Sequence, residues 1–169
     1  GDGSLGGKAR GLAFLNHILQ KNDLYDRWED VRLMIPRTMV VTTTYFDRFI
    51  VENGLQYVIN ADLSDEEILS EFVASSLPED LTQALRMFIR VEHHPLAVRS
   101  SSKLEDSHYQ PFAGIYSTYM IPYVEDKYMR LEILSNAIKS VYASVFYRAS
   151  KDYMVATSNV IDQEKMAVI

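Results

Sequence analysis

The chain has 169 residues, of which 47% are hydrophobic and 24% charged, so it can bury about two-thirds of its unfolded surface in a globular core. Its net charge of −6 at pH 7 argues against broad binding to nucleic acid or anionic membranes. Cysteine is absent, which excludes disulfides and thiolate metal sites and favours a cytoplasmic location, and no apolar run approaches the roughly 20 residues of a membrane span.

The first predicted element is an amphipathic helix from Ala9 to Lys21, with apolar residues at helical spacing: Leu12, Leu15, Ile18 and Leu19. Residues 38–42 follow Pro36 and have the pattern of a buried strand. A short helix then begins near Thr44, and Gly54 is a typical C-terminal stop for it. These segments alternate between helical and extended patterns without a repeat.

Two more helices are predicted in the middle of the chain. Ser64 and Glu67 have the spacing of a capping box, and Pro78 suits the first turn of the next helix. Residues 95–98 then predict a strand that delivers Arg99 and three serines to its end.

The last third of the chain predicts a strand over residues 116–121, one long helix over 128–152 and a final strand over 166–169. The mixture indicates the α+β class, with helices packed on short mixed β-sheets. Both ends look cut, so we expect residues 1–169 to be one truncated domain, with room for two small lobes.

A phosphate site is suggested by Gly6, Gly7 and Lys8 at the start of the first helix. Glycines leave the first helical amides unshielded, and those amides attract anions. A lysine in a first turn opposes the helix dipole unless an anion is also present. The segment is not a P-loop, because Asp2 stands where that motif needs glycine and Ala9 where it needs Ser or Thr.

A second set of phosphate ligands is suggested by Arg99, Ser100 and Ser101. The planar arginine fork binds phosphate oxygens bidentately. Two plainer interpretations stay open: Arg99 could pair with Glu105 or Asp106, and the serines could cap nearby backbone amides. His93 and His94 have no third ligand partner, and we interpret them as solvated loop residues.

Read in order, five segments resemble the nucleotide-binding region of the dikinase family that includes phosphoenolpyruvate synthase and pyruvate phosphate dikinase. Residues 6–12 resemble the family's GGKGANL, and residues 35–43 its IPVPPGFVVTT. Residues 97–106 are similar to AVRSSATAED, residues 112–118 to FAGQQDTF, and residues 141–146 to VWASLF. The resemblance spans nearly the whole chain.

The resemblance implies an ATP-grasp-like fold that binds ATP between lobes. The family transfers the terminal two phosphates of ATP to a histidine on a separate swivelling domain, releases AMP, and finally passes one phosphoryl group to pyruvate; in the pyruvate, water dikinase type the other goes to water. The residues that would bind ATP are Lys8, Arg99, Ser100, Ser101, Gly114, Ser117 and Thr118. The ligands of Mg²⁺ are expected beyond Ile169, and no catalytic residue is expected within this chain, which should be inactive alone.

Departures from the family pattern leave alternatives. Ser117 stands where the family often has an acidic residue, and Ile115 where it often has glutamine. The chain could therefore belong to a non-catalytic nucleotide-binding or regulatory module. It could also belong to a relative with another acceptor: a glucan, an antibiotic, or phosphate instead of water as second acceptor.

Overall fold

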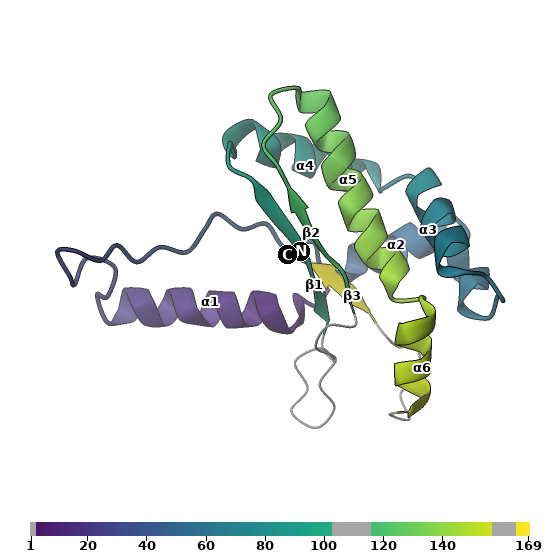
Figure 1. Ribbon diagram of the computed structural model, residues 1–169. Helices are drawn as coiled ribbons and strands as arrows, with labels where there is room; N and C mark the ends of the chain where they lie inside the picture. The colour runs from purple at the N-terminus through teal and green to yellow at the C-terminus, as the bar shows by residue number, and fades with distance from the viewer. Residues whose placement is uncertain (1–2, 103–115, 157–164) are drawn as a thin grey trace.

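The computed structural model describes residues 3–102, 116–156 and 165–169 (Figure 1). Their helices and strands confirm the α+β class. The elements, in chain order, are α1 (Gly6–Lys21), α2 (Thr43–Glu52), a 3₁₀ helix (Leu55–Ile59), α3 (Asp65–Ala74), α4 (Glu79–Val91), β1 (Leu96–Ser102), β2 (Thr118–Ile121), α5 (Lys127–Ser144), α6 (Arg148–Ala156) and β3 (Met166–Val168).

The described strands form one sheet in the order β2-β1-β3. Both pairs are antiparallel, where we expected a mixed sheet. The first half of β1 pairs with β2, from Leu96 opposite Ile121 to Arg99 opposite Thr118. Its second half pairs with β3, so the serines of residues 100–102 lie inside the sheet.

Helix α5 contacts all three strands and also packs on α3 and α4 (Figure 1). The core between these layers is rich in aromatic rings, and Phe49, Phe72 and Tyr142 are completely buried. The ring centroids of Phe46 and Tyr142 lie 5.1 Å apart in an edge-on contact. Each such side chain contributes about 1.5–3 kcal/mol by burial, so this cluster anchors the helical layer.

Helix ends follow the local sequence signals. The Ser64 hydroxyl accepts from the Glu67 amide at 3.2 Å, and the Glu67 carboxylate accepts from the Ser64 amide at 2.8 Å, which confirms the capping box. Helix α2 ends at Glu52, and Gly54 just beyond has φ of +64°, a conformation that favours glycine.

The helix predicted over residues 128–152 is instead two helices. Helix α5 ends at Ser144, and α6 begins at Arg148, whose amide donates to the Asp65 carboxylate at 2.8 Å. Val145 and Phe146, in the turn between the two helices, are both buried. Apolar spacing continues across the turn, which is why periodicity alone missed it.

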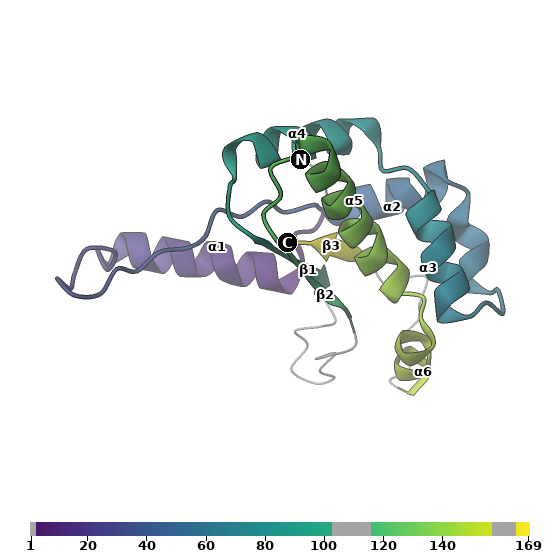
Figure 2. The ribbon, with the colours of Figure 1, turned by 45° about the horizontal axis from the view of Figure 1, so that its top comes forward.

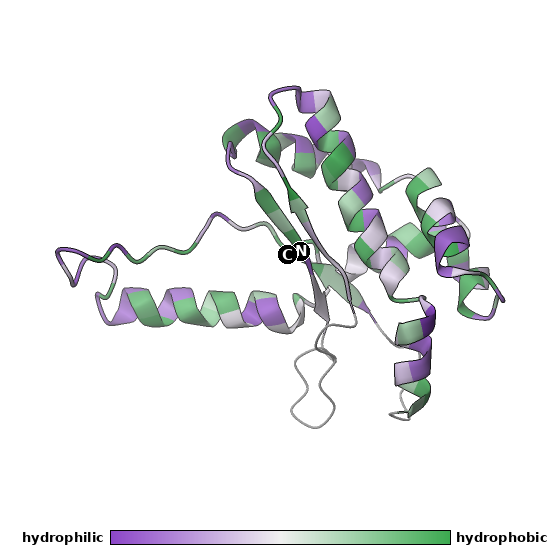
Figure 3. Cartoon of the chain, in the orientation of Figure 1, coloured by the Kyte–Doolittle hydropathy of each residue, from purple (hydrophilic) through white to green (hydrophobic). Residues whose placement is uncertain are grey.

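Helix α1 projects from the rest of the molecule, and residues 22–42 run back alongside it (Figures 1 and 2). Hydrophobic residues occur along α1 (Figure 3), yet only Gly6 and Ala9 are buried in it. The strand predicted over residues 38–42 is wrong: only Val41 forms a bridge, with Val168. Val41 and Val168 exchange two backbone hydrogen bonds, at 2.8 and 2.9 Å, and the pairing does not extend to the other residues of the segment.

Candidate functional site

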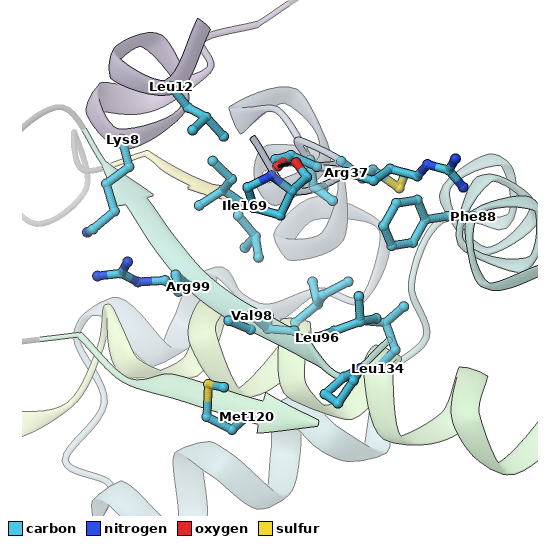
Figure 4. A pocket seen from close by; sticks show the side chains of 18 of the residues that line it. Lys8, Leu12, Arg37, Phe88, Leu96, Val98, Arg99, Met120, Leu134 and Ile169 are labelled. Carbon is cyan, nitrogen blue, oxygen red and sulfur yellow. Dashed lines mark hydrogen bonds between the residues drawn. The ribbon is translucent and has the colours of Figure 1, made fainter. Parts of the chain in front are cut away.

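A cavity of about 680 Å³ opens between α1, residues 36–41, α4, β1 and α5. Much of its lining is apolar, including Leu12, Phe88, Leu96 and Leu134 (Figure 4). The charged side chains among its described lining residues are all cations: Lys8, Arg37 and Arg99. A cavity of this character suits a ligand that has an anionic part and an apolar part.

Lys8 reaches this cavity from the first turn of α1, which begins at Gly6 and contains no acidic residue. The helix dipole there favours an anion, so an added positive charge raises the local potential further. In Figure 4 the Lys8 side chain extends toward the guanidinium of Arg99, at one end of the cavity. An anion bound between these two like charges would relieve their repulsion.

Arg99 lies within β1, whereas we expected it at a strand end. Its amide donates to the Ile169 carbonyl at 2.9 Å, and its carbonyl accepts from the Ile169 amide at 2.9 Å. The strand continues past it because β3 pairs with residues 100–102. Its side chain is exposed and lines the cavity. The alternative partners, Glu105 and Asp106, lie outside the described residues.

The serines after Arg99 are buried in the strand. The Ser101 hydroxyl donates to the Leu5 carbonyl at 3.0 Å and accepts from the Ala9 amide at 3.2 Å. Its only proton is therefore used within the protein, which favours the capping interpretation for this residue. Ser100 is 2% exposed.

The other predicted ATP ligands are Gly114, Ser117 and Thr118. Gly114 lies outside the described residues. Ser117 is half-buried, and Thr118 is exposed at the start of β2, directly opposite Arg99.

Sequence reasoning missed one of the charged residues that line the cavity. Arg37 lines the cavity, and its Nη1 donates to the Val91 carbonyl at 2.8 Å. This hydrogen bond connects residues 36–41 to the C-terminal end of α4. Arg37 has neither glycines nor serines beside it, so no local signal separated it from an ordinary surface arginine.

His93 and His94 are exposed, as expected for loop residues. The ring of His94 lies 2.6 Å from a carboxylate oxygen of Glu92, and this hydrogen bond holds the pKa of Glu92 below its usual value. Within the described residues, no group of three or more His, Asp or Glu side chains is arranged to hold a metal ion. None of the described helices is long and apolar enough to span a membrane.

Comparison with known proteins gives two findings. Residues 2–169 match the family described as "Pyruvate phosphate dikinase, AMP/ATP-binding domain". A Bacillus subtilis (strain 168) protein, described as "Uncharacterized phosphotransferase YvkC", is 27% identical over 137 residues. The match covers 81% of this chain and 15% of that relative, so the chain spans a small part of the relative's length.

Proposed function

This chain belongs to the pyruvate phosphate dikinase AMP/ATP-binding domain family, and we propose that ATP binds in the cavity with its phosphates between Lys8 and Arg99. The family supports ATP as the ligand of a dikinase-like phosphotransferase. The observation that carries the site assignment is that two cations from distant parts of the sequence line one end of a single apolar cavity.

Each cation has a distinct role in this proposal. The guanidinium of Arg99 offers a planar fork that can bind two phosphate oxygens, whereas Lys8 supplies a compact point charge. A charge-assisted contact of this kind contributes about 1.5–3 kcal/mol. The first-turn amides of α1 add fixed donors beside Lys8.

The apolar remainder of the cavity would receive the base. Leu12 and Phe88 line it from α1 and α4, and Leu96 lines it from β1. Burying a planar ring against such side chains is favourable in proportion to the apolar area removed from water. Gly114, Ser117 and Thr118 complete the proposed ATP-binding set, and Ser100 is left out of it because it is buried on the opposite face of β1 from Arg99.

For the protein as a whole, we propose the dikinase reaction of the pyruvate, water type: a histidine on a swivelling domain takes the terminal two phosphates of ATP, AMP leaves, one phosphoryl group passes to water and the other to pyruvate. Magnesium would neutralise phosphate charge, and the proposal places its ligands outside this chain. Within the chain, Lys8 and Arg99 bind and orient the phosphates, and phosphoryl transfer depends mainly on such positioning and charge neutralisation. The proposal also includes the ATP-grasp-like arrangement of lobes.

A second candidate is a nucleotide-binding regulatory module without turnover. The observation that favours it is Ser117, which stands where the family often has an acidic residue. Acceptors other than pyruvate are compatible with the same ATP site, because the acceptor does not contact Lys8 or Arg99 in this proposal.

The test is titration of the chain with ATP at low and high salt, using wild type, Lys8→Ala and Arg99→Ala. We expect a dissociation constant of roughly high micromolar to millimolar, because one lobe supplies only part of the contacts. Each variant should weaken binding by about 10-fold or more. Arg86→Ala is the matched control, since Arg86 is exposed on α4 and does not line the cavity. Binding that neither cavity variant alters would refute the site assignment.

A further inference from the structure

The Ser101 hydroxyl occupies an unusual position at the start of α1. In an α-helix, the carbonyl of Leu5 and the amide of Ala9 are the pair that bond directly to each other. Here the hydroxyl of Ser101 bonds to both groups, at 3.0 Å and 3.2 Å, from a residue 92 positions away from Ala9. The first turn of α1 is thereby joined to β1 through one side chain.

A second contact fixes the same two backbones. Gly6 has φ of +74°, and a Cβ added there would lie 1.6 Å from the carbonyl oxygen of Ser101. The backbone of α1 therefore approaches β1 more closely than any residue with a side chain allows. Gly6 and Ser101 together define how the helix start sits against the strand.

Lys8 and Arg99, the two cavity cations assigned to the phosphates, lie on either side of this junction. Lys8 directly precedes Ala9 in the first turn of α1. Arg99 is two residues before Ser101, so both side chains leave β1 on the same face. A shift of α1 relative to β1 would consequently change the separation of the two cations.

We propose that Ser101 is a positioning residue, which sets the location of Lys8 relative to Arg99 so that both bind the same phosphate chain. This inference rests on the proposed ATP site. Ser101 acts through the backbone of α1 and does not itself donate to the phosphates.

The geometry also predicts that removing this hydroxyl leaves a folded protein. Helix α1 begins at Gly6 with Leu5 as its N-cap, so the Leu5 carbonyl still accepts the first helical hydrogen bond, from the Ala9 amide, in Ser101→Ala and neither group is orphaned. What is lost is the side-chain bridge from β1 to α1, while the close approach of Gly6 to the Ser101 backbone remains. We therefore expect Ser101→Ala to weaken polyphosphate binding while the melting temperature stays close to that of the wild type.

The test is a double-mutant cycle on the full chain, with wild type, Ser101→Ala, Lys8→Ala and the double variant. Binding of ATP and of inorganic tripolyphosphate is followed by NMR titration at low ionic strength, where charge-driven binding is strongest. We expect Ser101→Ala to weaken binding about 3- to 10-fold in the presence of Lys8 and less than about 2-fold in its absence.

Ser144→Ala is the matched control. Ser144 is also completely buried, but its hydroxyl donates within α5, to the Val141 carbonyl at 2.7 Å. This variant should leave polyphosphate affinity unchanged in both backgrounds. If Ser101→Ala does not fold, the same cycle is run with Ser101→Cys. Because a thiol is a weaker hydrogen-bonding group than a hydroxyl, this variant should lose less polyphosphate affinity than expected for alanine, and the loss should again depend on Lys8.

The outcomes separate this inference from the proposed site. If Lys8→Ala and Arg99→Ala bind ATP as tightly as the wild type, the assignment of the ATP site is refuted, and the positioning role of Ser101 is refuted with it. If those variants weaken binding but the effect of Ser101→Ala is absent, or equal with and without Lys8, only the positioning role is refuted.

Discussion

Arg99 and Thr118 lie directly opposite one another in the β1–β2 pair, so their side chains leave the same face of the sheet. Arg99 lines the cavity together with Lys8. The strand pairing thus brings the start of β2 beside the cation that we assign to the phosphates. The family resemblance had named Lys8, Arg99 and Thr118 as ATP ligands, but it did not say how they lie relative to one another.

The chemistry of Arg99 predicts that lysine cannot replace it. Arg99→Lys keeps the charge but loses the planar fork, so its ATP affinity should fall by about 1.5–3 kcal/mol, close to the loss in Arg99→Ala. Calorimetric titration of both variants against the wild type measures this. Full retention of affinity in Arg99→Lys would show that only charge matters at this position.

Gly6→Ala should displace the start of α1. The added Cβ would meet the Ser101 backbone, and a positive φ costs a residue with a side chain about 1–2 kcal/mol in addition. We expect a lower melting temperature and weaker ATP binding. Gly11→Ala is the control for stability alone, since Gly11 also lines the cavity: its Cβ would have no neighbour within 4 Å, and alanine favours a helix interior by up to about 1 kcal/mol. Equal stability of the two variants would contradict the close approach.

Tyr142→Phe should leave the protein as stable as the wild type or more stable. Within the described residues, the buried Tyr142 hydroxyl has no hydrogen-bond partner, and an unsatisfied buried group costs about 1–3 kcal/mol. Tyr45→Phe is the contrast, since the Tyr45 hydroxyl donates to Asp80 at 3.1 Å and its loss should destabilise by about 0.5–1.5 kcal/mol. Denaturant unfolding measures both, and clear destabilisation by Tyr142→Phe would reveal a partner for the hydroxyl.

Asp80 should make stability depend on acid pH. The Arg48 guanidinium lies 2.9 Å from its carboxylate and holds the pKa of Asp80 below its ordinary value of 3.8. The contribution is therefore complete above about pH 4 and is lost as the pH falls through the lowered pKa. Melting temperatures of wild type and Asp80→Asn at pH 7 and pH 3 test this. The difference between the two proteins should shrink at pH 3, and a constant difference would exclude the linkage.

The isolated chain should not turn over ATP. The proposed reaction needs a histidine in a separate domain and metal ligands that the proposal places outside this chain, and phosphoryl transfer depends on the positioning that both supply. Incubation of the pure chain with ATP, magnesium and pyruvate should yield no AMP above background. Robust AMP formation would mean that the chain carries the chemistry itself.

Local sequence signals predicted much of the secondary structure correctly. The capping box of Ser64 and Glu67 and the stop at Gly54 were predictable because each depends on residues within one or two turns. The α+β class and the first part of β1 were predicted in the same way, although the strand continues to Ser102 and not only to Val98. The dikinase resemblance is also a property of sequence alone, and the family match confirms it.

The errors arose where distant contacts decided the outcome. The break before Arg148 depends on Asp65, which lies 83 positions away. The extended segment around Val41 pairs with β3 at one residue alone, through a contact between Val41 and Val168 that is distant in sequence. The spacing of apolar residues predicts neither contact, since it indicates which residues are buried but not which residues they contact.

The sequence by itself determined the family and the residue types of the candidate site, since glycines, Lys8 and Arg99 are recognisable in their local motifs. Only the tertiary structure decided that Lys8 and Arg99 share one cavity and that Arg37 joins its lining. It also assigned the Ser101 hydroxyl to the start of α1. The physical reason is that these relationships depend on how α1 packs against β1, and no short-range preference encodes a contact across 92 positions.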